Sequence, residues 1–256
     1  MPKSSIIVLG SSSGVPQAGR ASSGYLLKTG DSATLFDCGG GVTMSFLQTG
    51  IDPLEIDRIF ISHTHPDHVS DLPLMIQLIY LKGRTKPLEI FLPEEFVEIF
   101  KKYLNAVYLL VEKIPFELKI AGYGDGFKYE GNLKIKAIGN SHLKRYAELV
   151  EEHNLPNKMM CHSFEIEFGD KSLFYSADIG EYAEIKTYLY NRDLAIVEAA
   201  HIDLEQFIAD APEFSTKTLV ISHLGSVEDV AQIKELIQKA GLENVVIAED
   251  GLEFEL

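Results

Sequence analysis

Residues 60–73 read FISHTHPDHVSDLP, and this stretch places three histidines and one aspartate at His63, His65, Asp67 and His68. The cluster follows the apolar run RIFIS, which predicts a strand ending at the histidines. His63 and His65 lie two positions apart, so at a strand end their side chains leave the same face, and Asp67 and His68 follow in a turn. Zinc prefers imidazole nitrogen and carboxylate oxygen as ligands. The stretch therefore predicts a metal site that suits two adjacent ions, and a histidine-rich surface loop is the alternative.

The rest of the chain alternates strand-like and helical patterns. Helices are predicted at 72–83 and 94–110, and a third lies in the C-terminal strand, helix, strand pattern of 218–256, with Ser226 as its N-cap and Gly241 as its stop. The other segments read as strands: 5–10, 25–30, 32–41, 58–62, 87–93, 116–122, 133–142, 162–169, 171–180 and 194–201. Strand-rich segments with a helix late in each half indicate two packed sheets covered by helices.

Length and composition suit a single globular domain over residues 1–256, because 46% apolar residues can bury a substantial core. The first apolar run is too short for a signal peptide and no later run reaches membrane-spanning length, so we expect a cytoplasmic protein without a membrane anchor. The two cysteines, Cys38 and Cys161, are too few for a disulfide framework. We expect both to be buried side chains.

The formal net charge is −15, which argues against a broad positive face for nucleic acid. The clearest basic cluster is LKGRTKP, and we expect Lys82, Arg84 and Lys86 there to be solvated loop charges. A polyanionic substrate would need a local basic patch or a metal site. Extended nucleic-acid binding is therefore not expected.

The run HTHPDH at 63–68 matches the HxHxDH signature of the metallo-β-lactamase superfamily, and the resemblance covers nearly the whole chain. It implies an α+β fold, a four-layer αβ/βα sandwich in which two mixed β-sheets are flanked by helices. It also implies two divalent metal ions as cofactors, with Zn²⁺ as the first choice and Mn²⁺ or Fe²⁺ as alternatives.

The resemblance extends to ligands beyond the signature. His142, Asp178 and His223 each follow an apolar strand, as the family's later ligands do. His162 is a rival of His142, and we expect it to line the substrate pocket instead. By resemblance, one metal is held by His63, His65 and His142, the other by Asp67, His68 and His223, and Asp178 bridges them.

Two glycine-rich segments also match family elements. FDCGGG at 36–41 resembles an Asp-x-Gly turn, which implies that Asp37 orients a ligand or a loop, with a plain turn as the alternative. GSSSGVPQAGR at 10–20 lacks the Gly-Lys-Ser/Thr ending of a phosphate loop. It loosely resembles a loop that borders the active site in ribonuclease Z relatives, through Ser13, Gly14, Pro16 and Arg20. Ser13 and Arg20 are therefore candidate substrate-pocket residues.

Two adjacent metals sharing a hydroxide would support hydrolysis. Asp67 is then a candidate catalytic residue that orients the hydroxide or takes its proton. His201 is a candidate proton donor to the leaving group, with Glu198 fixing its tautomer. The alternative for this pair is a strand end without a catalytic role.

The resemblance is greatest to the ribonuclease Z and phosphodiesterase branch, although Asp71 stands where that branch carries glycine. The long tRNA-gripping arm and the Phe-Ser-x-Arg-Tyr type ending of ribonuclease Z are missing from this sequence. The expected function is a dinuclear zinc phosphodiesterase acting on a small phosphodiester or nucleotide. A lactone or thioester hydrolase and a tRNA 3′-processing endonuclease are the alternatives. A homodimer is compatible with the sequence, which leaves the oligomeric state open.

Overall fold

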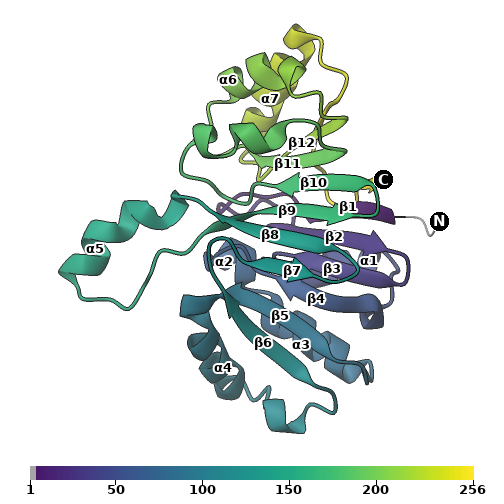
Figure 1. Cartoon of the computed structure of the whole chain (residues 1–256), viewed down its shortest axis with the longest axis vertical. Coiled ribbons are helices and arrows are strands. Elements are labelled where there is room, and N and C mark those ends of the chain that lie inside the picture. The colour runs from purple at the N-terminus through teal and green to yellow at the C-terminus, as the bar shows by residue number, and fades with distance from the viewer. Residues whose placement is uncertain (1–3) are drawn as a thin grey trace. The chain divides into compact units, whose positions relative to one another are not determined.

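The computed structural model describes residues 4–256. The chain divides into two compact units, one formed by residues up to Tyr123 together with Glu249–Leu256 and the other by Gly124–Ala248. Each unit contains one seven-stranded mixed sheet with helices packed on it (Figure 1). The prediction of two mixed sheets flanked by helices is confirmed.

The sheet of the first unit includes the strand that precedes the histidine cluster. Its first pairs, from β14 to β3, are antiparallel, and the pairs from β3 to β6 are parallel. The strands in spatial order are β14 (Glu253–Glu255), β1 (Ser4–Gly10), β2 (Gly24–Thr29), β3 (Ser32–Phe36), β4 (Ile56–Phe60), β5 (Leu88–Pro93) and β6 (Leu118–Tyr123).

Helices cover one face of this sheet and enclose a single apolar core. They are α1 (Val42–Gln48), α2 (Pro66–Val69), α3 (Leu72–Leu81) and α4 (Val97–Ala106). Helix α3 buries Leu72, Met75, Ile76 and Ile79, which share one face at helical spacing. The two helices predicted from periodicity are therefore present, whereas α1 was not foreseen.

Arg84 corrects the expectation of a solvated basic loop, because only 2% of this residue is exposed. Its Nε donates to the carbonyl of Lys86 at 2.8 Å and its Nη1 to the carbonyl of Leu54 at 3.1 Å. Its Nη2 donates to the carbonyl of Pro87 at 2.5 Å and to Asp57 at 3.3 Å. The planar guanidinium satisfies acceptors from two chain segments, so this arginine joins the loops structurally.

The second unit repeats the mixed pattern of antiparallel and then parallel pairs. Its strands in spatial order are β13 (Val245–Ile247), β12 (Thr218–Ser222), β11 (Leu194–Glu198), β10 (Lys171–Tyr175), β9 (His162–Phe168), β8 (Lys134–Gly139) and β7 (Lys128–Glu130).

The helices of the second unit are α5 (Ala147–Glu152), α6 (Leu204–Asp210) and α7 (Val227–Ala240). Helix α7 begins with a capping box between Ser226 and Asp229 and ends at Gly241, whose φ is 64°. Both predicted ends of this helix are confirmed. None of the helices within residues 4–256 is long and apolar enough to cross a membrane.

The strands that lead to the candidate ligands are shorter than the sequence predicts. The strand before His142 ends at Gly139, and His142 begins a short 3-10 helix; β10 ends at Tyr175, before Asp178. His223 directly follows β12 with a φ of 55°. The candidate ligand side chains therefore project from turns just beyond the strand ends. In a turn, a side chain is not restricted to the two faces of the sheet.

Candidate metal centre

A buried carboxylate, Asp37, organises residues 63–68, the candidate metal motif of the first unit. It follows β3 with a φ of 58°, an unusual conformation for a residue other than glycine. Its Oδ1 accepts from the backbone N–H of Ser62 at 2.7 Å, and its Oδ2 accepts from Ser62 Oγ at 2.8 Å. His68 Nδ1 lies 2.8 Å from the same Oδ2. Asp37 therefore orients a predicted ligand, as expected from the FDCGGG turn.

These contacts determine which imidazole nitrogens carry protons. A carboxylate can only accept, so His68 Nδ1 donates to Asp37, and in the neutral ring Nε2 keeps the lone pair. Ser62 Oγ uses its own proton on Asp37, so at 3.0 Å it accepts from His63 Nδ1. In the neutral ring of His63, Nε2 then also carries the lone pair. Ser62 was not foreseen, although its place beside His63 was visible in the sequence.

The candidate ligand atoms within this motif have spacings that suit zinc. Four ligands at 2.0–2.1 Å in a tetrahedron lie about 3.3 Å from one another. His63 Nε2 lies 3.2 Å from His65 Nδ1, and His68 Nε2 lies 3.4 Å from Asp67 Oδ2. The two pairs match the division between two metals that the resemblance implies.

The two glycine-rich segments pack against the same motif. A Cβ at Gly39 would lie 2.0 Å from the backbone oxygen of Asp67, so only glycine fits there. A Cβ at Gly14 would lie 3.5 Å from Asp67 Oδ2, which places this loop beside the candidate catalytic carboxylate. Ser13 is buried and Arg20 is partly exposed in the same loop.

The second unit brings together the later candidates around Asp178, which is 2% exposed. Its Oδ2 lies 3.6 Å from His142 Nε2, and its Oδ1 lies 3.4 Å from His223 Nε2. Each oxygen therefore faces a different imidazole. A carboxylate with two oxygens in this arrangement is suited to bridge two cations.

Asn140 supports this arrangement and was missed by sequence reasoning. Its side-chain N–H donates to the carbonyl of Asp178 at 2.9 Å, and its oxygen accepts from the backbone N–H of His142 at 3.1 Å. Its position two residues before His142 was the available signal. His162, the rival ligand, begins β9 and is 2% exposed.

His201 and Glu198 form a hydrogen-bonded pair beside Asp178. His201 Nδ1 lies 3.0 Å from Glu198 Oε1 and 3.9 Å from Asp178 Oδ2. The hydrogen bond to Glu198 raises the pKa of His201 above its ordinary value, although burial opposes this change. Glu198 also accepts backbone N–H groups from Ile179, Ala200 and His201, so it is held in place. The expected fixing of the His201 tautomer is consistent with this geometry.

Cys38 and Cys161 are both buried, as expected. Burial, and then the charges of Asp71 and Asp37, raise the pKa of the Cys38 thiol well above its ordinary value. The thiol is therefore neutral near pH 7. Imidazole nitrogens and carboxylate oxygens remain as the donor set of the candidate centre, and such donors fit a divalent metal such as Zn²⁺.

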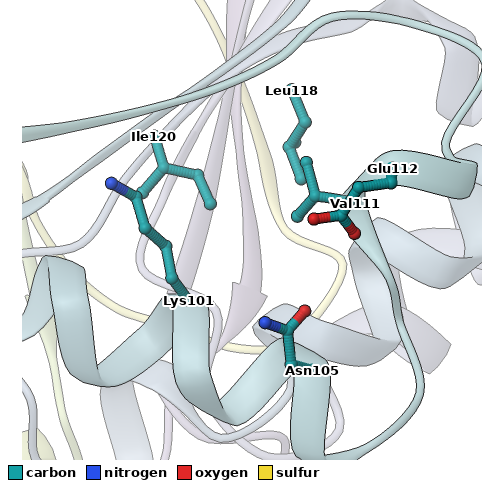
Figure 2. A pocket seen from close by; sticks show the side chains of 6 residues that line it. All are labelled: Lys101, Asn105, Val111, Glu112, Leu118 and Ile120. Atoms are coloured by element: carbon teal, nitrogen blue, oxygen red, sulfur yellow. The ribbon is translucent and has the colours of Figure 1, made fainter.

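A separate cavity of about 390 Å³ lies beside α4 and β6 in the first unit (Figure 2). It is lined by Lys101, Asn105, Val111, Glu112, Leu118 and Ile120. None of the candidate site residues lines it. Its one lysine and one glutamate give it no evident ligand chemistry.

Comparison with known proteins gives three informative matches. Ribonuclease Z of Picrophilus torridus is 34% identical over 152 residues, covering 59% of this chain and 48% of that protein. The metallo-β-lactamase fold protein YhfI of Bacillus subtilis has a TM-score of 0.79 at 22% identity, with 100% of both chains covered. Zinc-bound PqqB from Methylobacterium extorquens has a TM-score of 0.67 at 14% identity, covering 98% of this chain and 100% of that chain.

The structural match to YhfI establishes the metallo-β-lactamase fold. The matched segment spans about half or less of the length of the curated relatives. A family model described as Anti-Pycsar protein Apyc1 matches residues 4–233, which is most of the chain. The chain therefore has the metallo-β-lactamase fold and belongs to the Anti-Pycsar protein Apyc1 family.

Proposed function

We propose that this protein is a dinuclear metal-dependent phosphodiesterase that acts on a small phosphodiester or nucleotide-type substrate, with Zn²⁺ as its metal. The observation that carries the proposal is the pairing of donor atoms at 3.2–3.6 Å within each unit. This spacing is close to the separation of about 3.3 Å between ligand atoms of tetrahedral zinc.

The proposed ligand set uses every one of these pairs. Asp178 is proposed as the bridge because its two oxygens face different histidines. The tautomers imposed through Asp37 support the assignment, since they leave Nε2 of His63 and His68 without a proton. We assign one metal to His63, His65 and His142, and the other to Asp67, His68 and His223.

When bound, the two ions would supply Lewis acidity, lowering the pKa of an attacking water and stabilising charge on the phosphoryl oxygens. Asp67 is proposed to orient that water or accept its proton, because its carboxylate lies at the end of the motif beside His68. His201 is proposed to donate a proton to the leaving oxygen. Its raised pKa favours the protonated form, and Glu198 holds the ring by Nδ1, so Nε2 would deliver the proton.

The substrate class follows from charge and from the relatives. Ribonuclease Z, by its name, acts on RNA, whose backbone is a phosphodiester, and this supports phosphodiester chemistry here. The net charge of −15 opposes binding of a long polyanion. We therefore place a small phosphodiester first and tRNA 3′-end cleavage second. We also propose a cytoplasmic location. Light scattering would measure whether the chain is a monomer or a homodimer.

The test compares turnover of bis(p-nitrophenyl) phosphate, cyclic nucleotides, a lactone and a precursor tRNA by the zinc-loaded chain. An Asp178→Ala variant measures background hydrolysis by contaminants. We expect hydrolysis of at least one small phosphodiester by the native chain and none by the variant. Cleavage of precursor tRNA alone would favour the second candidate, and turnover of the lactone alone would overturn the proposed chemistry.

A further inference from the structure

The N-terminal loop is closed at its neck by a carboxylate from the far end of the chain. Asp250 Oδ1 accepts from the backbone N–H of Ser11 at 3.0 Å and from Ser11 Oγ at 2.8 Å. Its Oδ2 accepts from the backbone N–H of Ala21 at 2.6 Å. One side chain thus joins both ends of the loop that spans residues 12–20. Hydrogen bonds to a charged acceptor are among the stronger ones in proteins.

Asp250 is itself held by the turn that leads into β14. The backbone N–H of Gly251 donates to the carbonyl of Val8 at 2.7 Å, and Leu252 receives a bond from the N–H of Val8 at 2.9 Å. Gly251 has a φ of 88°, which favours glycine at this turn. β1 therefore positions the carboxylate under the neck of the loop, independently of the loop itself.

The neck is also tightly packed. Ser12 donates its backbone N–H to the carbonyl of Ala21 at 3.0 Å. A Cβ at Gly10 would lie 1.7 Å from the backbone oxygen of Ser22, so the two chain segments touch. Within the loop, Ser12 Oγ donates to the carbonyl of Val15 at 3.2 Å. The loop is therefore compact, and Asp250, a backbone hydrogen bond and close packing hold its two ends together.

The tip of the loop lies against the candidate metal motif, and its last residue is an arginine. Gly14 lies against the carboxylate of Asp67, the proposed catalytic ligand. Arg20, beside the neck, has a buried Nη1 that makes no hydrogen bond within residues 4–256. A buried guanidinium nitrogen retains donors for an anionic group. The loop therefore combines a tip that lies against Asp67 with a positive charge at its last residue.

We propose that Asp250 is a positioning residue for substrate binding, which holds the loop of residues 12–20 in the conformation that contacts the phosphodiester. This inference rests on the proposed function for the identity of the substrate. Asp250 touches neither substrate nor metal; it acts by raising the fraction of molecules whose loop is competent to bind. Apparent affinity falls in proportion when that fraction falls.

The test compares the zinc-loaded native chain with Asp250→Ala, the isosteric Asp250→Asn, and Glu249→Gln as a matched control. Glu249 neighbours Asp250 and is exposed, so its variant removes one charge from the same turn without affecting the neck. KM and kcat are measured with the small phosphodiester that the native chain hydrolyses best. Zinc content and amide hydrogen exchange of residues 12–20 are measured on the same samples.

We expect Asp250→Ala to raise KM about tenfold to a hundredfold, as the loss of charge-assisted hydrogen bonds implies, with kcat changed less than about threefold. Exchange in the loop should accelerate while zinc content stays native. The KM and loop exchange rate of Asp250→Asn should lie between those of the native chain and Asp250→Ala, since asparagine keeps one acceptor oxygen. Glu249→Gln should match the native chain in both.

The proposal is overturned if both Asp250→Asn and Asp250→Ala have a KM within about twofold of the native value, whatever the exchange rates. A twofold change corresponds to a free energy of RT ln 2, which is far smaller than the contribution of one hydrogen bond to a charged group. Loss of zinc in parallel with activity would also overturn it, since Asp250 would then act through the metal motif. If the native chain hydrolyses no substrate, the proposed function fails separately. Hydrogen exchange alone then decides the positioning role: unchanged exchange in the loop refutes it.

Discussion

Replacing Asp37 by asparagine changes the proton arrangement of the metal motif without changing the shape of the side chain. The variant keeps an oxygen for the N–H of Ser62, but its amide N–H₂ faces Ser62 Oγ and His68 Nδ1, which both lie 2.8 Å from Oδ2 in the native protein. Two donors then oppose each other at His68. The ring can relieve this conflict by moving its proton to Nε2, which blocks that nitrogen as a ligand.

The size of the effect follows from the burial and charge of these contacts. Asp37 is 0% exposed, so water cannot replace the lost acceptor. A hydrogen bond to a charged group contributes about 1.5–3 kcal/mol, so the free energy of unfolding of the metal-free protein should fall by about 2–4 kcal/mol. Loss of a group that orients a ligand typically lowers metal affinity about 10-fold to 100-fold.

Urea unfolding of the metal-free protein and zinc titration against a competing chelator measure the two effects. Asp31→Asn is the matched control, because Asp31 is exposed in the turn between β2 and β3. The reasoning is refuted if Asp37→Asn unfolds within about 0.5 kcal/mol of native and binds zinc within about twofold, since that range is typical of surface substitutions.

Three further outcomes are expected. His201→Gln should lower kcat about 10²-fold to 10⁴-fold for a diester with a poor leaving group and much less for a p-nitrophenyl ester, which needs no proton donor; equal losses would contradict the assigned role. His142→Ala should lose zinc, whereas His162→Ala should mainly change KM, and the reverse result would exchange their roles. Lys186 donates to Asp210 and holds the pKa of that carboxyl below its ordinary value. The ion pair therefore stabilises the fold above pH ~4, where the unfolded chain also carries an ionised Asp210. This contribution disappears as the pH falls through the pKa of Asp210 in the folded protein. Lys186→Met should therefore lower stability at pH 6 but not at pH 2 in urea unfolding, and an equal loss at both pH values would contradict this.

The parts of the molecule that depend on neighbours in sequence were predictable. The histidine motif lies within six consecutive positions, so its chemistry was visible before its geometry. The same holds for α7, whose limits are set locally by Ser226 and Gly241. The alternation of apolar and polar residues along the strands was also visible, but it continues past the last residue that pairs with a neighbouring strand. The strands before His142 and Asp178 were therefore predicted too long.

The parts that depend on distant partners were not predictable. Arg84 looked like a solvated charge, and it is buried because carbonyl groups from Leu54 and Pro87 surround it. Asp250 looked like one acidic residue among many, and its partners Ser11 and Ala21 lie more than two hundred positions away. No local pattern encodes such contacts, since they arise only when β14 pairs with β1.

We propose that each chain holds two metal ions. Elemental analysis of the protein, purified with added zinc and freed of loosely bound metal, measures this number. The two-metal assignment predicts about two zinc ions per chain. The Asp178→Ala variant lacks the proposed bridging carboxylate, so it should retain fewer zinc ions per chain than the native protein. Native protein that contains no metal after this treatment would contradict the assignment of all seven ligands.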